Sequence, residues 1–198
     1  MSMQKITTEM LSKAMNYEEY MQLFEKVVAE KRTTGPNQNE NLTHYTELNL
    51  HRTRRVIKTF KVPVEVSKQI ETLFSQTWIL ITEAWCGDAA HSLGVIQKMA
   101  ACNPNVKFHI LLRDENLALM DSFLTNGTRS IPKLILCEGE ELNIKGHWGP
   151  RPADLQNEFL KLKEQGVAKE ELQIYEQNWY NADKGKKIMG ELIDILIK

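Results

Sequence analysis

The sequence predicts an α/β protein built on a mixed four-stranded central sheet that is flanked by helices. Three observations support this fold class. Four short runs of strand-forming residues occupy the middle of the chain. The first three runs are joined by segments with helical spacing, which favours parallel strands, whereas only Glu138–Glu140 separates the last two, which favours an antiparallel hairpin. The four runs are Trp78–Thr82, Val106–Leu112, Lys133–Cys137 and Leu142–His147.

The composition is that of an ordinary soluble globular protein. The 198 residues are 42% hydrophobic and 26% charged, which suits one domain with a buried core plus extensions. The net charge of −1 gives no electrostatic reason to expect nucleic acid or a membrane surface as partner. The basic cluster His51–Arg55 is interpreted as the solvated face of a helix. We predict an N-terminal helical extension over 1–60, a central domain over 61–165, and a C-terminal helical extension over 166–198 packed on the same domain.

Helical patterns fill the N-terminal segment. Thr7 or Thr8 is the candidate N-cap of a short first helix. The segments Tyr17–Lys31 and Asn41–Phe60 place apolar residues at spacings of three and four, which indicates amphipathic helices, and Thr33–Asn37 between them is a turn. Because these helices have apolar faces, we expect them to pack on the domain that follows.

The central domain begins with Val62–Val64, a bend or short strand, and a short helix over Ser67–Ser75. The run Trp78–Thr82 is almost entirely apolar, so this strand is expected at the centre of the sheet. A helix over Gly87–Cys102 follows it directly. The same spacing rule predicts the later helices. They cover Glu115–Leu124, Pro152–Leu162, Lys169–Tyr180 and Lys184–Ile197.

The most chemically informative position is Cys86, which lies where the first strand ends and the next helix starts. The free N–H groups of a helix's first turn and the positive end of its dipole stabilise a thiolate. A free thiol titrates near about 8.5, and a helix N-terminus can lower that pKa by one to several units. Cys86 is therefore the candidate nucleophile.

Two motifs resemble the active site of the thioredoxin family. The first is Trp85-Cys86-Gly87-Asp88-Ala89 after a strand, and the second is Arg129-Ser130-Ile131-Pro132 just before one. The resemblance, which Gly146 extends weakly, implies a thioredoxin-like fold over roughly residues 60–165. It also implies a cis Ile131–Pro132 bond that faces Cys86. The chain is similar to a bacterial branch of thioredoxin-like proteins with a Trp-Cys-Gly-Asp loop and added helices at both ends.

The resemblance further implies a groove for an extended peptide beside the candidate nucleophile. Trp85 is expected either to offer a flat surface beside the thiol or to pack over the helix start. Trp148 is expected either to line the groove or to close the core at the end of the last strand. The candidate groove residues are Trp85, Gly87, Asp88, Ile131, Pro132 and Trp148.

Three residues depart from the family pattern. Ala89 replaces the second active-site cysteine, and Asp88 stands where thioredoxins have proline. Leu80 occupies the place of a buried carboxylate that assists proton transfer in the family. Glu83, which precedes Cys86 by three residues, is a candidate substitute for that carboxylate.

A dithiol cycle needs a second thiol that attacks the mixed disulfide, and the sequence offers none within reach. Cys102 lies about 16 residues along the same predicted helix, roughly 24 Å away at about 1.5 Å per residue. Cys137 lies about 16 Å beyond Pro132 along an extended strand. A disulfide allows a Cα separation of only about 7 Å. The redox reaction that remains is one-thiol chemistry, in which an external thiol resolves a mixed disulfide or sulfenic acid on Cys86.

Glu83 and His91 are candidate modulators of the thiol. A carboxylate at Asp88 favours the helix start but opposes a neighbouring thiolate. His91, about one helical turn beyond Asp88, would offset that charge if it were protonated. A solvated surface histidine is the simpler interpretation of His91.

Two hypotheses of function follow, from different classes of protein. The first is one-thiol disulfide chemistry in cell redox homeostasis, with Cys86 as nucleophile and a protein or a low-molecular-weight thiol or disulfide as partner. The second is a non-catalytic thioredoxin-fold module that binds peptides or proteins. A dithiol reductase is the weakest candidate, so the question of enzyme activity stays open.

The sequence also bounds the setting of the protein. Three scattered cysteines do not form a disulfide framework and no Cys/His spacing suggests zinc, so neither a metal nor another cofactor is expected. No apolar run approaches the ~20 residues of a membrane span, and the N-terminus lacks the apolar core of a signal peptide. We therefore predict a cytoplasmic protein, with the helical extensions as candidate surfaces for a homo-oligomer.

Overall fold

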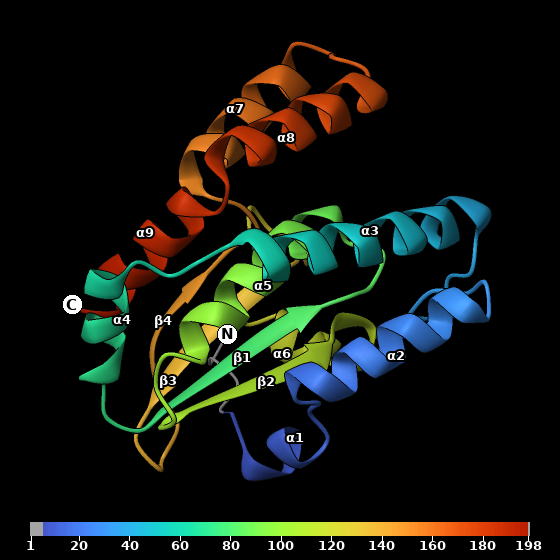
Figure 1. Ribbon diagram of the computed structural model, residues 1–198. Helices are drawn as coiled ribbons and strands as arrows, with labels where there is room; N and C mark the ends of the chain where they lie inside the picture. The colour runs from blue at the N-terminus through green and yellow to red at the C-terminus, as the bar shows by residue number, and fades with distance from the viewer. Residues whose placement is uncertain (1–5, 198) are drawn as a thin grey trace.

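The computed structural model describes residues 6–197 and has a four-stranded sheet with helices on both faces, which confirms the α/β class (Figure 1). The strand order across the sheet is β2-β1-β3-β4. The first and central strand, β1, is buried along its whole length, as its apolar sequence predicts. The strands are β1 (Gln76–Thr82), β2 (Val106–Leu112), β3 (Lys133–Glu138) and β4 (Asn143–Trp148).

The sheet is mixed because its two halves are connected differently. β1 and β2 are parallel, with Trp78 opposite Phe108, and a helix crosses over between them. β3 is antiparallel to β1 on its other side, so the parallel direction expected for the third strand is wrong: the chain after β2 stays at the edge where β1 ends, and Lys133 at the start of β3 pairs with Ile81. β4 is antiparallel to β3, with a bulge at Leu136 and Cys137. This arrangement directs the end of β1 and the start of β3 to the same edge of the sheet.

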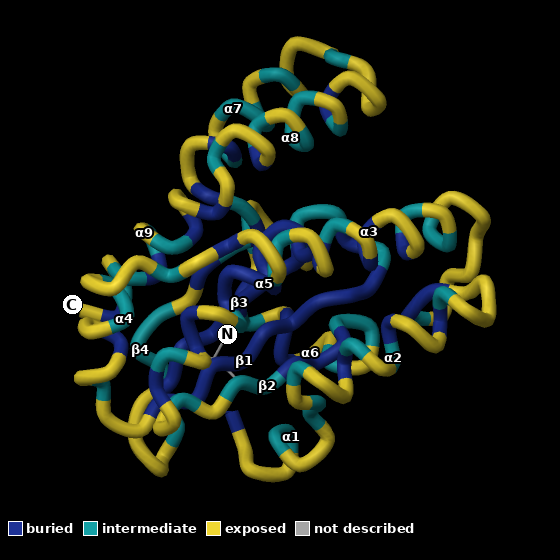
Figure 2. The backbone as a smooth tube through the Cα atoms, viewed as in Figure 1, coloured by how far each residue is buried: buried dark blue, intermediate teal, exposed yellow. Residues whose placement is uncertain are grey.

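Alternate residues of β1 build two separate cores. Trp78 and Leu80 belong to the core beneath α5 (Gly87–Ala100), whereas Ile79 and Ile81 belong to the core beneath α6 (Leu117–Met120). The helices α2 (Tyr17–Ala29), α3 (Glu40–Thr59), α4 (Val64–Glu71) and α9 (Lys186–Leu196) add apolar side chains to the first core. Figure 2 shows the central strand β1 as buried, whereas the outer strands β2 and β4 contain residues of intermediate burial.

The N-terminal helices begin where polar side chains cap them. Thr7 caps α1 (Thr8–Ser12), Asn16 forms a capping box at the start of α2, and Asn39 caps α3. The helix α3 packs along α5, where Gly94 lies against Val56 and Ile57. A Cβ on Gly94 would lie 2.9 Å from the backbone nitrogen of Ile57, so only glycine permits this spacing.

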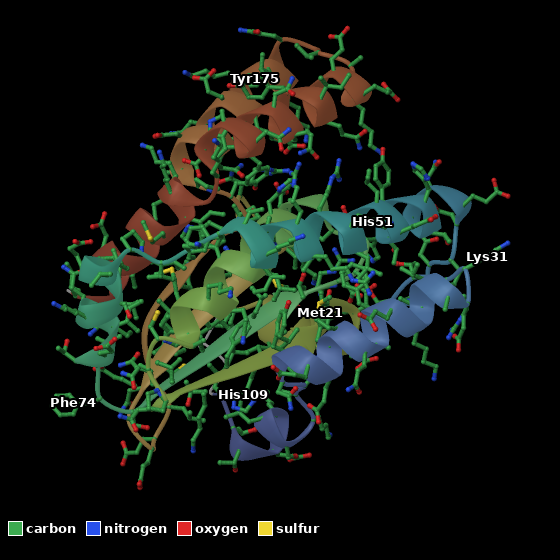
Figure 3. All side chains as sticks on the ribbon, viewed as in Figure 1. Met21, Lys31, His51, Phe74, His109 and Tyr175 are labelled. Atoms are coloured by element: carbon green, nitrogen blue, oxygen red, sulfur yellow. The ribbon has the colours of Figure 1, made fainter. Side chains whose placement is uncertain are left out.

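Two predicted helices differ from the observed ones. The helix predicted over Ser67–Ser75 begins earlier, directly after Pro63, and leaves Phe74 outside it and 90% exposed (Figure 3). The helix predicted over Glu115–Leu124 is instead a 3-10 turn followed by the single-turn α6. Asn116 interrupts it, because its side-chain Nδ2 donates to the Leu112 carbonyl at 2.8 Å and its backbone is not helical.

The C-terminal segment forms a hairpin and a returning helix. The helices α7 (Ala153–Glu164) and α8 (Lys169–Asp183) extend away from the sheet as a hairpin, at the top of Figure 1. The chain reverses at Lys184 and Gly185, both in the left-handed region. The helix α9 then packs on β4 and α5, where Gly146 admits Ile195 so closely that a Cβ would lie 2.6 Å from Cγ2.

Candidate functional site

The two sequence motifs meet at the edge of the sheet. Cys86 is the N-cap residue of α5, with extended backbone angles (φ −81°, ψ 115°). The Ile131–Pro132 peptide bond is cis. The Cys86 Sγ donates a hydrogen bond to the Ile131 carbonyl oxygen at 3.3 Å. The candidate nucleophile and the proline motif therefore form one site.

The environment of Cys86 opposes a thiolate. The residue is only 6% exposed. Burial, and then the neighbouring charge of Asp88, raise the pKa of the thiol to about 12, although the amides of Ala89 and Asp88 act in the opposite direction. At this helix start, desolvation outweighs the favourable effect of the helix N-terminus. The thiol of the free protein is a neutral hydrogen-bond donor.

Asp88 belongs to a partly buried polar cluster that sequence reasoning missed. Its carboxylate forms an ion pair with Arg151 at 2.9 Å and accepts a hydrogen bond from the Tyr180 hydroxyl at 2.8 Å. Arg151 also forms an ion pair with Glu176 at 2.7 Å, and its guanidinium lies 4.1 Å from the centre of the Phe159 ring. The cluster ties the start of α5 to α8.

The charge balance of this cluster is uneven. One guanidinium, that of Arg151, faces two carboxylates, those of Asp88 and Glu176. Burial and the charge of Asp88 raise the pKa of Glu176 to about 7, and burial also raises the pKa of Asp88. No local sequence signal identifies these partners, since they come from a loop and a helix far along the chain.

The interpretation of His91 as a solvated surface residue is wrong. His91 is 6% exposed, and its ring stacks on Tyr180 at 4.3 Å between centroids. Burial, followed by the positive charges of Arg52 and Arg55, lowers the pKa of His91 to about 3. The imidazole is therefore neutral at physiological pH and does not offset the charge of Asp88.

The candidate modulator Glu83 is completely buried. Its Oε1 accepts a hydrogen bond from the backbone N–H of Asp114 at 2.9 Å, and burial raises its pKa. The Thr34 side chain and the backbone of Asp114 act in the opposite direction and lower that pKa. The side chain thus joins the end of β1 to the loop after β2.

The two tryptophans of the predicted groove lie in different places. Trp85 is half-buried beside Cys86, and the Arg113 guanidinium lies 4.7 Å from its ring centre. Trp148 is only 5% exposed and belongs to the main core, and its Nε1 donates to Glu191 at 2.6 Å. Trp148 therefore closes the core at the end of β4. Pro132 is likewise buried behind the site.

A cleft of about 700 Å³ opens over Cys86. Its floor carries Trp85, Cys86, Gly87, Asp88 and Ile131 from the two motifs. One wall comes from α3 and the opposite wall from α8, so helices from both ends of the chain border the candidate site, and both are visible in Figure 1. The Tyr45 hydroxyl of α3 donates to Gln173 of α8 at 2.8 Å and bridges the two walls.

The other expectations about chemistry concern the cysteines and metals. Cys86, Cys102 and Cys137 are all free thiols. Ala89 is buried where the family has its second cysteine. In residues 6–197 no group of three or more His, Cys, Asp or Glu side chains is placed to hold a metal ion. No helix in that part of the chain has the length and apolar character needed to cross a membrane.

A strand-to-helix cysteine that faces a cis proline on a mixed four-stranded sheet defines a thioredoxin-like protein. A family model described as thioredoxin matches residues 35–170. This match spans more than half of the chain, which therefore belongs to the thioredoxin family. The matched region starts before α3 and ends at the beginning of α8. Among curated proteins, none matches the chain.

Two solved structures share this fold. One is a protein of unknown function from Pseudomonas aeruginosa, with a TM-score of 0.57 and 16% identity, where the alignment covers 91% of this chain and 96% of the other. The second is an HIV epitope-scaffold, with a TM-score of 0.55 and 16% identity over 91% of this chain and 97% of the scaffold. At this identity the likeness concerns the fold alone.

Proposed function

We propose that this chain is a non-catalytic binding protein of the thioredoxin family, in which the cleft over Cys86 holds a peptide or protein ligand. The observation that carries the proposal is the state of the Cys86 thiol. It is buried, it donates a hydrogen bond to the Ile131 carbonyl, and its pKa is raised to about 12. Because only the thiolate attacks a disulfide, this thiol is poorly suited to exchange at neutral pH.

The form of the cleft supports the same proposal. A volume of about 700 Å³ lies within the usual range for ligand pockets, roughly 300–1,000 Å³. The walls formed by α3 and α8 enlarge the contact surface beyond the Cys86 loop. The loss of a resolving thiol at Ala89 removes a catalytic function from the site without removing the cleft.

A cysteine-free random peptide library displayed against the wild-type protein tests the proposal. A selected peptide should bind the Cys86→Ser variant with a dissociation constant within about twofold of wild type. It should lose at least tenfold affinity for Gly87→Leu, which fills the cleft floor. The matched control is Gly190→Leu on α9, where an added Cβ meets no atom within 4 Å. Failure to select any peptide, or loss of binding in Cys86→Ser, would overturn the proposal.

One-thiol exchange is the second candidate, and one observation favours it. The Cys86 thiol borders the cleft, and the amides of Ala89 and Asp88 and the charge of Arg151 all act to lower its pKa. In this reaction the Cys86 thiolate attacks one sulfur of a disulfide, forms a mixed disulfide and releases the other half as a thiolate.

Exposure to glutathione disulfide at pH 7.5, followed by peptide mass mapping, separates the two candidates. A glutathione adduct confined to Cys86 would establish exchange and displace the binding proposal. Adducts on the half-buried Cys102 without any on Cys86 would support the binding proposal.

The setting that we propose is the reducing cytoplasm of a bacterium. The three unpaired cysteines support a reducing compartment, and the Trp-Cys-Gly-Asp-Ala loop supports the bacterial branch. The ligands expected there are proteins or low-molecular-weight thiols and disulfides.

A further inference from the structure

The basic cluster His51–Arg55 on α3 does not act as a single solvated face. Arg54 is exposed and pairs with Glu25 of α2 at 2.6 Å, as a solvated helix face would. Arg55 donates to the Asn181 side chain at 2.8 Å, near the end of α8. Arg52 is half-buried and faces the cleft. His51, labelled on α3 in Figure 3, is exposed.

A buried amide holds the Arg52 side chain in place. Arg52 Nη1 donates to Asn49 Oδ1 at 3.0 Å, and Asn49 Nδ2 donates to the Ala84 carbonyl at 3.2 Å. Asn49 is completely buried, so its orientation is fixed by the protein interior. Arg52 Nη1 also lies 3.9 Å from the position that a Cβ on Gly87 would occupy. The guanidinium is therefore anchored beside the first residue of α5 and next to Cys86.

The cleft contains more positive than negative side chains, and most of the positive ones already form ion pairs with carboxylates of the protein. Arg151 pairs with Asp88 and Glu176, which are the carboxylates of the cleft. The remaining cations of the cleft are Arg52, Arg113, Arg129 and Lys169.

Arg52 differs from the other arginines of the cleft in having no counter-charge. Arg113 pairs with Asp114 at 2.7 Å and Arg129 pairs with Asp121 at 2.6 Å. In the described chain, residues 6–197, no carboxylate lies within ion-pair distance of Arg52, and only the neutral Asn49 accepts from it. Burial of the side chain, together with the charge of Arg55, opposes its positive charge. A partly desolvated cation without an anion is a site that an incoming anion stabilises.

We propose that the cleft binds its ligand through a carboxylate group that docks on Arg52, beside the Cys86 thiol. This inference rests on the proposed binding function and names the chemistry of the ligand. The guanidinium presents N–H groups in a fixed fork that matches the two oxygens of a carboxylate. Lys169, on the opposite wall and exposed, would attract a second acidic group of the same ligand.

A carboxylate suits the site better than a phosphate. The carboxylates of Asp88 and Glu176 already lie in the same cleft, and each opposes a further negative charge. One unpaired guanidinium balances the single charge of a carboxylate. A phosphate carries about 1.5 to 2 charges and would need a second free cation at the same point. The carboxylate can belong to an acidic peptide or to a small organic acid.

Two matched peptides and two small ions test the inference. The probes are an acetylated, amidated octapeptide of alternating serine and glutamate, the same peptide with glutamine, succinate, and inorganic phosphate. Binding is followed by calorimetry and by amide chemical shifts of the ¹⁵N-labelled protein. The glutamate peptide should bind at least tenfold more tightly than the glutamine peptide, with shifts at Gly87 and Ile131. Tighter binding of succinate than of that peptide would assign the site to small acids.

Matched arginine variants assign the effect to one side chain. Arg52→Gln should reduce the preference for the glutamate peptide to less than twofold. Arg54→Gln, which removes a neighbouring arginine outside the cleft, should leave the preference intact. Arg52→Lys should retain part of it, because the charge is kept and the fork is lost.

The outcomes separate this inference from the proposed function. Equal binding of the glutamate and glutamine peptides, preferential binding of phosphate, no binding of any carboxylate probe, or equal effects of the two arginine variants would each overturn the inference. If the peptide selected from the random library still binds the Arg52→Gln variant, the binding function stands and only the carboxylate assignment falls. If no peptide can be selected against the wild-type protein, the function itself falls.

Discussion

The charged side chains on the two sides of the cleft differ in whether they have ion-pair partners. At the start of α5, Asp88 shares the Arg151 guanidinium with Glu176, and the thiol of Cys86 is kept neutral beside this cluster. On α3, the Arg52 guanidinium is anchored by a buried amide but has no carboxylate partner in residues 6–197. The comparison shows how burial can oppose the effect of a helix N-terminus on a cysteine at this place in a thioredoxin fold. The group that we propose is available for a ligand is a cation on α3.

The largest expected effect on the free energy of unfolding comes from removing Arg151 from its pairs with Asp88 and Glu176. Arg151→Met leaves the carboxylates of Asp88 and Glu176 buried without their cation, so the free energy of unfolding should fall by about 3–5 kcal/mol. Urea unfolding followed by circular dichroism measures the change. Arg54→Met is the control, because its exposed pair with Glu25 should contribute only about 0–1 kcal/mol. A loss below 1 kcal/mol in Arg151→Met would show that the cluster does not hold the site together.

The pH dependence of stability should reflect the titration of Glu176, the second of the two carboxylates that face Arg151. Burial and the charge of Asp88 raise the pKa of Glu176 to about 7 in the folded protein, above its ordinary value of 4.5. A raised folded pKa contributes stability below about pH 4.5 that is lost as the pH rises through 7. Glu176→Gln should therefore gain stability relative to wild type between pH 5 and pH 8, by up to about 3 kcal/mol. Urea unfolding of both proteins at pH 5 and pH 8 tests this. An equal difference in the free energy of unfolding between variant and wild type at the two pH values would contradict the raised pKa.

A smaller effect on the free energy of unfolding is expected from displacing α3, the helix that carries Arg52. Gly94→Ala places a Cβ 2.9 Å from the Ile57 backbone nitrogen and should push α3 away from α5, at a cost of about 1–3 kcal/mol. The control is Gly190→Ala, which meets no atom within 4 Å and should be neutral or stabilising by up to about 1 kcal/mol. Equal stabilities of the two variants would show that the helix contact is looser than the structure indicates.

The four strands and the meeting of Cys86 with Ile131 could be predicted because their signals are local, whereas the antiparallel direction of β3 could not. An apolar run indicates a buried strand, and the two motifs carry the family's geometry with them. The division at Asn116 was missed because a side-chain bond to the Leu112 carbonyl competes with the helix there. The α/β fold class could be predicted because each strand and helix carries its own periodicity of apolar residues.

The electrostatics of the site could not be predicted from the sequence, because its partners come from distant elements. Nothing near Asp88 in the sequence indicates that Arg151 and Tyr180 enclose it. His91 looks like a solvated residue until the α8 hairpin supplies the ring that covers it. Arg52 looks like one of several surface arginines until Asn49 directs it toward the cleft.

The most direct test of the account is the rate of alkylation of Cys86 against pH, measured by mass spectrometry on the native protein. The half-buried Cys102 serves as the more accessible thiol, and Cys137, whose pKa burial raises to about 11, serves as the buried one. The account predicts that Cys86 labels at least a hundredfold more slowly than Cys102 at pH 8, with no midpoint below pH 9. Fast labelling of Cys86 with a midpoint below about 8.5 would identify an activated thiolate and contradict the account.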